Sequence, residues 1–311
     1  MTLNGESRFK FGCAPNSWGV LDYPGPSWEQ SYRTMLDQMV WAGYEGIELG
    51  PYGFFPIEEL LLPELEQRNL QLIGCFTGVR LSDPASASTV IDHVRKVVDL
   101  LSALGAPFLV IADEQSPARD KISGRVPADG SAGLSAAQWK HVGSIVAELA
   151  KLVNDYGLDL VFHPRVATYV ETPEETAIFF DAASGSNVGL CLDTGHCVYA
   201  GGDPAREAEK YRHILRHVHI KDLEFDILQQ ARKDELTFDQ AIERKIFTII
   251  GHGDVDFPVF FNTLAKNDYR GWCVVEQDIK FEAIEIPSAV SVAESLKYLR
   301  GVVAGESAST A

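Results

Sequence analysis

Two stretches of the chain read alike: VGLCLDTGHC at residues 188–197 and LRHVHIKDLE at residues 215–224. In each of them, a run of apolar residues ends abruptly in Asp, His or Lys. Proton-exchanging side chains that follow a buried strand at its C-terminal tip are typical of a barrel whose βα loops build the active site. The two stretches therefore predict both a fold and the place of its site.

Short apolar runs alternate with longer helical patterns along the chain. The strand candidates are residues 8–15, 46–50, 70–76, 107–113, 158–163, 188–193, 216–221 and 272–277. The helix candidates are residues 27–41, 57–68, 86–104, 136–156, 172–184, 204–214, 258–267 and 286–304. Two of these helices begin with capping boxes, SWEQ at 27–30 and TPEE at 172–175. Because the strand candidates are continuously apolar, we expect parallel strands that are covered on both faces.

This alternation predicts an α/β fold, a single (β/α)8 TIM barrel over residues 8–304 with flexible termini at 1–7 and 305–311. A doubly wound open sheet is the competing fold, but no glycine-rich phosphate-binding motif follows the first strand. Extended βα loops are expected after strand 4, at residues 113–135, and after strand 7, at residues 224–250. The first of them is either a lid over the site or a plain surface loop.

The composition limits the partners and the compartment. The chain has 311 residues and a formal net charge of −17, so its surface repels phosphate backbones and anionic lipids. We therefore expect neither a nucleic-acid nor a membrane partner, and no apolar run approaches the roughly 18 residues of a membrane span. None of the five cysteines forms a C-x-x-C pair, which indicates a reducing, cytoplasmic location.

Polar side chains end the last three predicted strands. Asp193 ends the sixth strand, His219 the seventh and Glu276 the eighth, and neighbouring strands bring these tips together. Their O, N and O donors suit one divalent ion, with Mn²⁺ or Co²⁺ preferred and Mg²⁺ or Zn²⁺ as alternatives. His163 at the tip of the fifth strand and Glu171 beyond it are both candidates for a fourth ligand. Glu171 is preferred, because a second carboxylate better balances a dication.

Other polar side chains are expected to face the same cavity. Glu48 ends the second strand, while Asn16 and Trp18 follow the first. Trp18 is either a core residue or a stacking face for a ring-shaped polyol. His196 follows the sixth strand, and Lys221 follows the seventh. Lys221 either binds a substrate oxyanion or moves a proton, or it forms a plain ion pair with Asp222.

At these residues the chain resembles the xylose-isomerase-like TIM barrel superfamily of metal-dependent sugar isomerases, epimerases and dehydratases, and within it the inosose dehydratase-like proteins. The matching motifs are APNSWGV (14–20), GYEGIELGPYGFFP (43–56), HPRVATYVET (163–172), LCLDTGHCVYAGGDP (190–204), HVHIKDL (217–223), GHGDVDF (251–257) and YRGWCVVEQD (269–278). The resemblance implies a metal site of Glu171, Asp193, His219 and Glu276. Relatives typically read H-P-H-x-G-T after strand 5, where this chain has Arg165 and Ala167 in place of His and Gly.

The resemblance implies proton abstraction next to a carbonyl. The expected enzyme is a metal-dependent lyase that removes water from a keto-cyclitol or keto-sugar, and a sugar isomerase or epimerase is the alternative. A non-catalytic sugar-binding barrel and an endonuclease acting on damaged DNA are disfavoured. The expected catalytic residues are Glu276, His196 and Lys221, and the expected substrate-binding residues are Asn16, Trp18, Glu48, His163 and Arg165. Barrels of this class often pair, so a homo-oligomer is possible, although no interface is identified.

Overall fold

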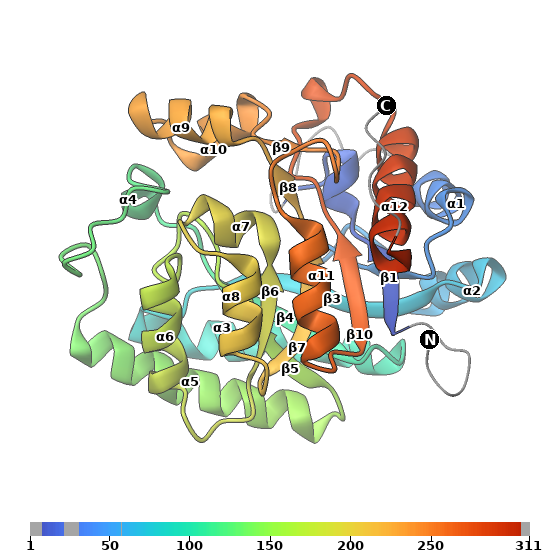
Figure 1. The fold of residues 1–311 in the computed structure, drawn as a ribbon. Helices are drawn as coiled ribbons and strands as arrows, with labels where there is room; N and C mark the ends of the chain where they lie inside the picture. Colours follow the sequence, from blue (N-terminus) through green and yellow to red (C-terminus); the bar gives the residue numbers. More distant parts are fainter. Residues whose placement is uncertain (1–7, 22–30, 57, 306–311) are drawn as a thin grey trace.

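Eight parallel strands form a closed barrel in the order β1-β10-β7-β6-β5-β4-β3-β2 (Figure 1). The computed structural model describes residues 8–21, 31–56 and 58–305. Outside these residues lie the predicted flexible terminus at 1–7, the predicted capping box at 27–30 and, except for Gly305, the predicted flexible terminus at 305–311. The closed barrel confirms the predicted fold class.

The barrel strands lie close to their predicted positions. Their bounds are β1 Phe9–Cys13, β2 Gly46–Glu48, β3 Gln71–Val79, β4 Phe108–Asp113, β5 Asp159–Phe162, β6 Gly189–Asp193, β7 Leu215–Ile220 and β10 Gly271–Val275. Strand β3 runs three residues beyond its prediction, because β4 provides partners for Thr77, Gly78 and Val79. The apolar run ends before the pairing with β4 does, so the sequence alone underestimates the length of this strand.

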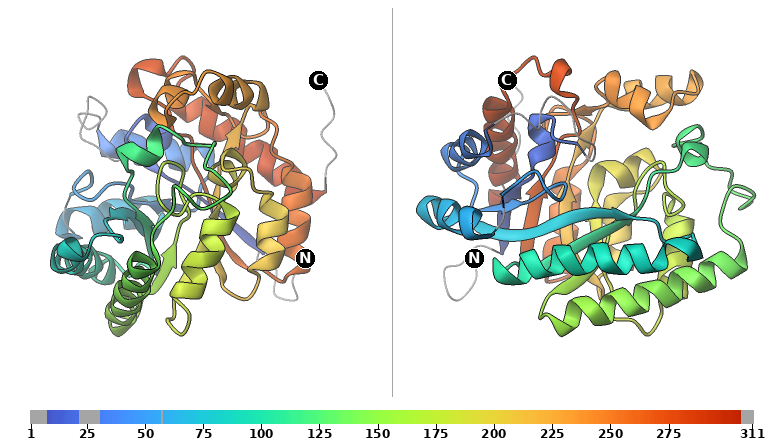
Figure 2. Two further views of the ribbon diagram at one scale, coloured as in Figure 1. Left: turned by 90° about the vertical axis from the view of Figure 1, so that its left-hand side faces the viewer. Right: turned by 180° about the vertical axis from the view of Figure 1, so that it is seen from behind.

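Helices lie outside the strands, as the two turned views show (Figure 2). Their bounds are α1 Tyr32–Ala42, α2 Glu58–Arg68, α3 Ala87–Ala103, α5 Ala136–Asp155, α6 Pro173–Ala182, α7 Thr194–Tyr199, α8 Pro204–Lys210, α11 Phe257–Lys266 and α12 Ser288–Ala304. The predicted capping box of α6 is present: the Thr172 side chain accepts from the Glu175 amide, and the Glu175 carboxylate accepts from the Thr172 amide. This fixes where the chain turns into α6 after β5.

Apolar side chains fill both the shell and the interior of the barrel. The main core lies between the strands and the surrounding helices and contains residues such as Leu36, Val97 and Leu149. A smaller group, which includes Ile73, Trp272 and Val274, packs inside the barrel. This filling makes the barrel interior a packed core and not an open pore.

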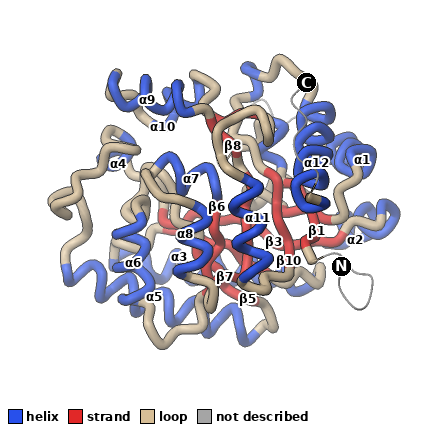
Figure 3. Tube along the Cα trace, in the orientation of Figure 1, coloured by secondary structure: helices blue, strands red, loops and turns tan. Residues whose placement is uncertain are grey.

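The two long βα connections carry extra elements at the end where the β10 arrow points. The connection after β4 contains α4 Pro117–Asp120, and the connection after β7 contains β8 Asp222–Leu223, α9 Phe225–Lys233, α10 Phe238–Glu243 and β9 Phe247–Thr248 (Figures 1 and 3). Arg125 Nη1 donates to the Leu236 carbonyl at 3.1 Å, and the Phe238 amide donates to Asp120 Oδ1 at 2.8 Å. These contacts fasten the two connections to each other above the barrel.

Among the described residues, no helix combines the length and the apolar character needed to cross a bilayer.

Candidate active site

The strand register brings the predicted strand-end residues together. Asp193 is the last residue of β6 and pairs in register with His219 of β7. Val275 pairs with Ile220, so Glu276, the next residue, extends β10 beside the tip of β7. All three polar side chains are buried. Parallel strands in register therefore create a dense cluster of acid and imidazole groups at the barrel mouth.

A pocket of about 460 Å³ opens over this cluster. The predicted site residues that line it are Asn16, Glu48, His163, Arg165, His196, His219, Lys221 and Glu276. The guanidinium of Arg165 lies over the ring of Phe76, 5.2 Å from its centroid, at one wall of the pocket. The lining is rich in hydrogen-bonding groups, as in a site for a small polar molecule.

The Glu48 carboxylate orients the rings of two histidines on β7, His217 and His219. Nε2 of His217 donates to Glu48 Oε2 at 2.9 Å, and Nε2 of His219 donates to the same oxygen at 3.2 Å. Burial opposes the charge of Glu48, but the neighbouring His219 and His217 hold its pKa well below the usual value. Burial opposes the charge of His219, but its acidic neighbours hold its pKa well above the usual value. A metal ligand must be neutral, and with Nε2–H hydrogen-bonded to Glu48, a neutral His219 would offer the lone pair of Nδ1.

The residues at the mouth fit a divalent metal ion. Among the described residues, three groups of potential ligands have atoms within 4.8 Å of one another: Cys191–His217–His219, His163–Asp193–His219 and Glu48–His219–Glu276. Nδ1 of His219 and Oδ2 of Asp193 are buried and lack hydrogen-bond partners. Their nearest charged neighbours are Glu276 Oε1, 3.4 Å from His219 Nδ1, and Lys221 Nζ, 3.3 Å from Asp193 Oδ2. Converging O and N donors of this kind suit a bound cation.

His163 lies within this arrangement. Its Nε2 is 3.5 Å from Asp193 Oδ2, and its ring centroid is 5.2 Å from that of His219. The imidazole at the tip of β5 is therefore placed beside two of the predicted ligands.

Lys221 inserts its ammonium group between carboxylates. Its Nζ lies 3.0 Å from Asp278 Oδ2, 3.1 Å from Glu276 Oε2 and 3.3 Å from Asp193 Oδ2. Burial opposes the charge of Lys221, but these three carboxylates outweigh it and hold its pKa above the usual value. Of the two roles expected for Lys221, the plain ion pair with its sequence neighbour Asp222 is not formed, because Asp222 accepts the backbone amides of residues 223, 251, 253 and 255 instead.

His196 is held as a neutral hydrogen-bond donor. Burial and the charge of Lys221 lower its pKa to about 3. Nδ1 accepts the Val166 amide at 3.3 Å, so the proton of the neutral ring lies on Nε2, which faces Asp278 Oδ2 at 3.6 Å. This tautomer offers an N–H, and not a lone pair, to a molecule in the pocket.

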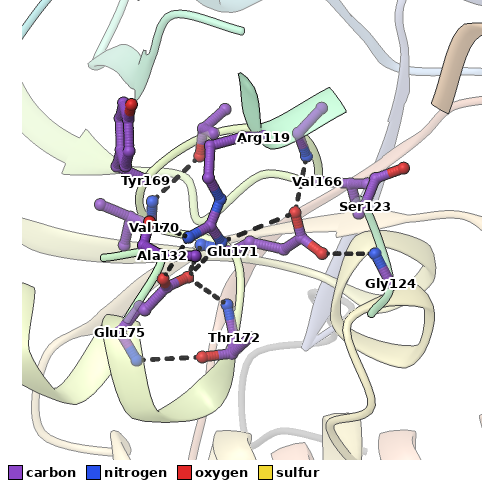
Figure 4. Close-up of polar contacts among 12 residues, drawn as sticks. Arg119, Ser123, Gly124, Ala132, Val166, Tyr169, Val170, Glu171, Thr172 and Glu175 are labelled. Atoms are coloured by element: carbon purple, nitrogen blue, oxygen red, sulfur yellow. Dashed lines mark hydrogen bonds and ion pairs between the residues drawn. The ribbon is translucent and has the colours of Figure 1, made fainter. Parts of the chain in front are cut away.

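Glu171 lies outside the three potential ligand groups. Its Oε1 accepts the Gly124 amide at 2.6 Å and its Oε2 accepts the Ala167 amide at 2.8 Å (Figure 4). Burial raises the pKa of Glu171 to about 7. Ala167 has a φ of 67°, in the left-handed region that favours glycine. Glu171 thus joins the β4 connection to the loop before α6.

Trp18 is buried in the main hydrophobic core, and it is absent from the residues that line the pocket. Its Nε1 donates to Gln38 Oε1 at 2.6 Å. Of the two roles expected for Trp18, this placement corresponds to the core residue.

Two residues of the cluster were not singled out from the sequence. Asp278 lies two positions after Glu276, and His217 lies two positions before His219. Side chains two apart along an extended segment point to the same side. Applying this alternation to the motifs VVEQD and HVHIK, at 274–278 and 217–221, would have found both residues.

The sequence profile of the xylose isomerase-like TIM barrel family matches residues 36–302. The chain belongs to this family. Its relatives include the rhizopine catabolism protein MocC of Rhizobium meliloti, which is 34% identical over 88% of this chain and 83% of the relative. Another is the inosose dehydratase of Clostridium perfringens, which is 30% identical over 95% of this chain and 98% of that enzyme. The predicted family is therefore confirmed, and the named relatives support the prediction of an enzyme.

A solved structure, that of an IOLI protein with a bound zinc atom, shares the fold. It is 17% identical, with a TM-score of 0.70, and the match covers 96% of this chain and 99% of that one. At this identity the likeness establishes the fold alone.

Proposed function

We propose that the protein is a divalent-metal-dependent lyase that removes water from a keto-cyclitol such as 2-keto-myo-inositol. The observation that carries the proposal is the barrel mouth, where His219 belongs to one potential ligand group with His163 and Asp193 and to another with Glu48 and Glu276, beside the pocket. The inosose dehydratase relatives, which align with nearly the whole chain, support the choice of substrate class.

Asp193, His219 and Glu276 are the proposed metal ligands, with His163 as the fourth. The 3.5 Å approach of His163 to Asp193 supports His163, while the backbone amides that Glu171 accepts argue against the preference for Glu171. A divalent ion held there supplies a Lewis acid next to the substrate oxygens, and Mn²⁺ or Co²⁺ remains the preferred ion.

The charges around the pocket suit an uncharged substrate. Four buried carboxylates, those of Glu48, Asp193, Glu276 and Asp278, face the cluster. Lys221 and Arg165 bring two positive charges, and a divalent ion would bring two more. With neutral histidines, as metal binding requires, the site has no net charge. A neutral polyol can then enter without an uncompensated charge.

The residues of the chain have separate parts in the proposed reaction. Glu276 is the proposed base that takes a proton from the carbon next to the carbonyl. The proposed donors to substrate oxygens are Nε2–H of His196, Nζ of Lys221 and the amide of Asn16, which line the pocket together with Arg165. The hydroxyl group on the neighbouring carbon leaves as water with a proton, and a carbon–carbon double bond conjugated to the carbonyl forms.

The test is incubation of the Mn²⁺-loaded protein with 2-keto-myo-inositol in D₂O. The proposal predicts a new ultraviolet absorbance from the conjugated product, and its loss in Glu276→Gln. Glu171→Gln is the matched control, because it makes the same carboxylate-to-amide change outside the proposed metal site. Deuterium incorporation without absorbance would point to the isomerase or epimerase alternative. No reaction with any keto-cyclitol or ketose would contradict the proposal.

A further inference from the structure

The ammonium of Lys221 occupies the centre of the acidic cluster. It is 1% exposed and lies within 3.3 Å of three carboxylates. Two of these, Asp193 and Glu276, are proposed metal ligands. One side chain therefore contacts two of the carboxylates that a metal ion would use.

The local structure is built to hold Lys221 in this place. Oγ1 of Thr194 accepts the Lys221 amide at 2.9 Å and donates to the Lys221 carbonyl at 2.7 Å. Gly195 faces the aliphatic stem, where an added Cβ would lie 2.8 Å from Cγ and 2.9 Å from Cβ of Lys221. Position 195 thus leaves no room for a side chain beside the lysine. Lys221 is fixed through its backbone, its stem and its charge.

Asp278 is the third carboxylate, and it belongs to none of the potential ligand groups. It is 6% exposed, and its Oδ1 accepts Nδ2 of Asn16 at 2.8 Å while its Oδ2 contacts Lys221. Asp278 is thus the carboxylate that can pair with Lys221 without giving up a metal ligand.

We propose that Lys221 is a built-in competitor of the metal ion, and that Asp278 is the positioning residue that draws its ammonium away from Asp193 and Glu276. This inference rests on the metal site of the proposed function. In the metal-free protein the ammonium compensates the buried carboxylates, which would otherwise repel one another. When the ion is present, two positive charges share one cluster, and their repulsion weakens metal binding.

The test is calorimetric titration of the metal-stripped, full-length protein with Mn²⁺. Lys221→Met is expected to bind Mn²⁺ about tenfold more tightly than the parent protein, because a nearby positive charge is lost. Lys280→Met removes the same charge from a lysine whose Nζ pairs with Glu243, and it is expected to leave the affinity unchanged. A parent protein that binds no metal would refute the proposed function. A parent that binds, with no tightening in Lys221→Met, would overturn this inference alone.

Asp278→Asn, measured with and without Lys221→Met, tests the positioning role. If Asp278 acts through Lys221, Asp278→Asn weakens Mn²⁺ binding about fivefold more in the parent background than in the Lys221→Met background. An equal loss in both backgrounds would contradict the role. The same titrations on Asn16→Ala show whether the Asn16 contact contributes.

Removal of Lys221 leaves buried carboxylates uncompensated, which destabilises the metal-free fold. Mn²⁺ is then expected to restore cooperative thermal unfolding in Lys221→Met and in Lys221→Gln, since the ion supplies the missing positive charge. Variants that stay unfolded in excess Mn²⁺ would overturn the competition between lysine and metal.

Discussion

Replacement of Arg119 by Met is expected to destabilise the protein strongly, although Arg119 lies on the short helix α4 of a long connection. Its guanidinium is 1% exposed and makes a two-pronged ion pair with Glu175, at 2.7 and 2.8 Å (Figure 4). Nη1 also donates to the Ala132 carbonyl at 3.2 Å. Arg119 thus fastens the β4 connection to the beginning of α6.

The size of the effect follows from burial. When one partner of a buried ion pair is removed, the other charge stays buried without compensation, which costs about 3–5 kcal/mol. For a chain of this length that loss corresponds to a fall in Tm of about 5–8 °C. The double variant Arg119→Met/Glu175→Gln removes both charges and is expected to recover most of the loss.

Urea unfolding followed by circular dichroism measures this difference. Arg80→Met is the matched control, because Arg80 pairs with Glu114 at 3.0 Å while the two side chains are 60% and 44% exposed. An exposed pair of this kind is worth about 0–1 kcal/mol. A loss in Arg119→Met no larger than that in Arg80→Met would refute the reasoning, as would a double variant less stable than the single one.

Three further predictions concern the metal and pH. Glu276→Gln is expected to lose bound Mn²⁺, measured by elemental analysis after gel filtration, whereas Glu171→Gln is expected to keep it, because Glu171 binds the amides of Gly124 and Ala167. Equal metal loss in both variants would contradict the ligand assignment. Burial raises the pKa of Asp113 to about 6 in the folded protein. As pH rises from about 4 to about 6, the unfolded chain loses the Asp113 proton before the folded protein does, so the free energy of unfolding falls by up to about 3 kcal/mol. Asp113→Asn is expected to flatten this slope in urea unfolding from pH 4 to 7, and an unchanged slope would exclude Asp113 as its source.

Much of the barrel could be predicted because local signals agree with the tertiary fold. The apolar runs end in polar residues at the strand tips, and a capping box at Thr172 marks the beginning of α6. Both signals are carried by a few adjacent residues. The end of β3 could not be found in this way, because Thr77 and Gly78 stay in the strand only through their pairing with β4.

The candidate site also contains some residues whose positions could be predicted from the sequence and others whose positions could not. Asp193, His219 and Glu276 could be placed because strand register carries them to one edge. Glu171 could not, because its position depends on the Gly124 amide, which arrives from a distant loop. Asp278 was overlooked although the two-residue alternation that includes it is local.

The most direct test of the account is an anomalous diffraction measurement on crystals of the full-length protein loaded with Mn²⁺ or Zn²⁺. The account predicts one strong anomalous peak at the barrel mouth, about 2.0–2.2 Å from atoms of Asp193, His219 and Glu276. The same map shows whether His163 completes the site. A peak beside Glu171 and away from His219, or no peak in metal-loaded crystals, would contradict the account.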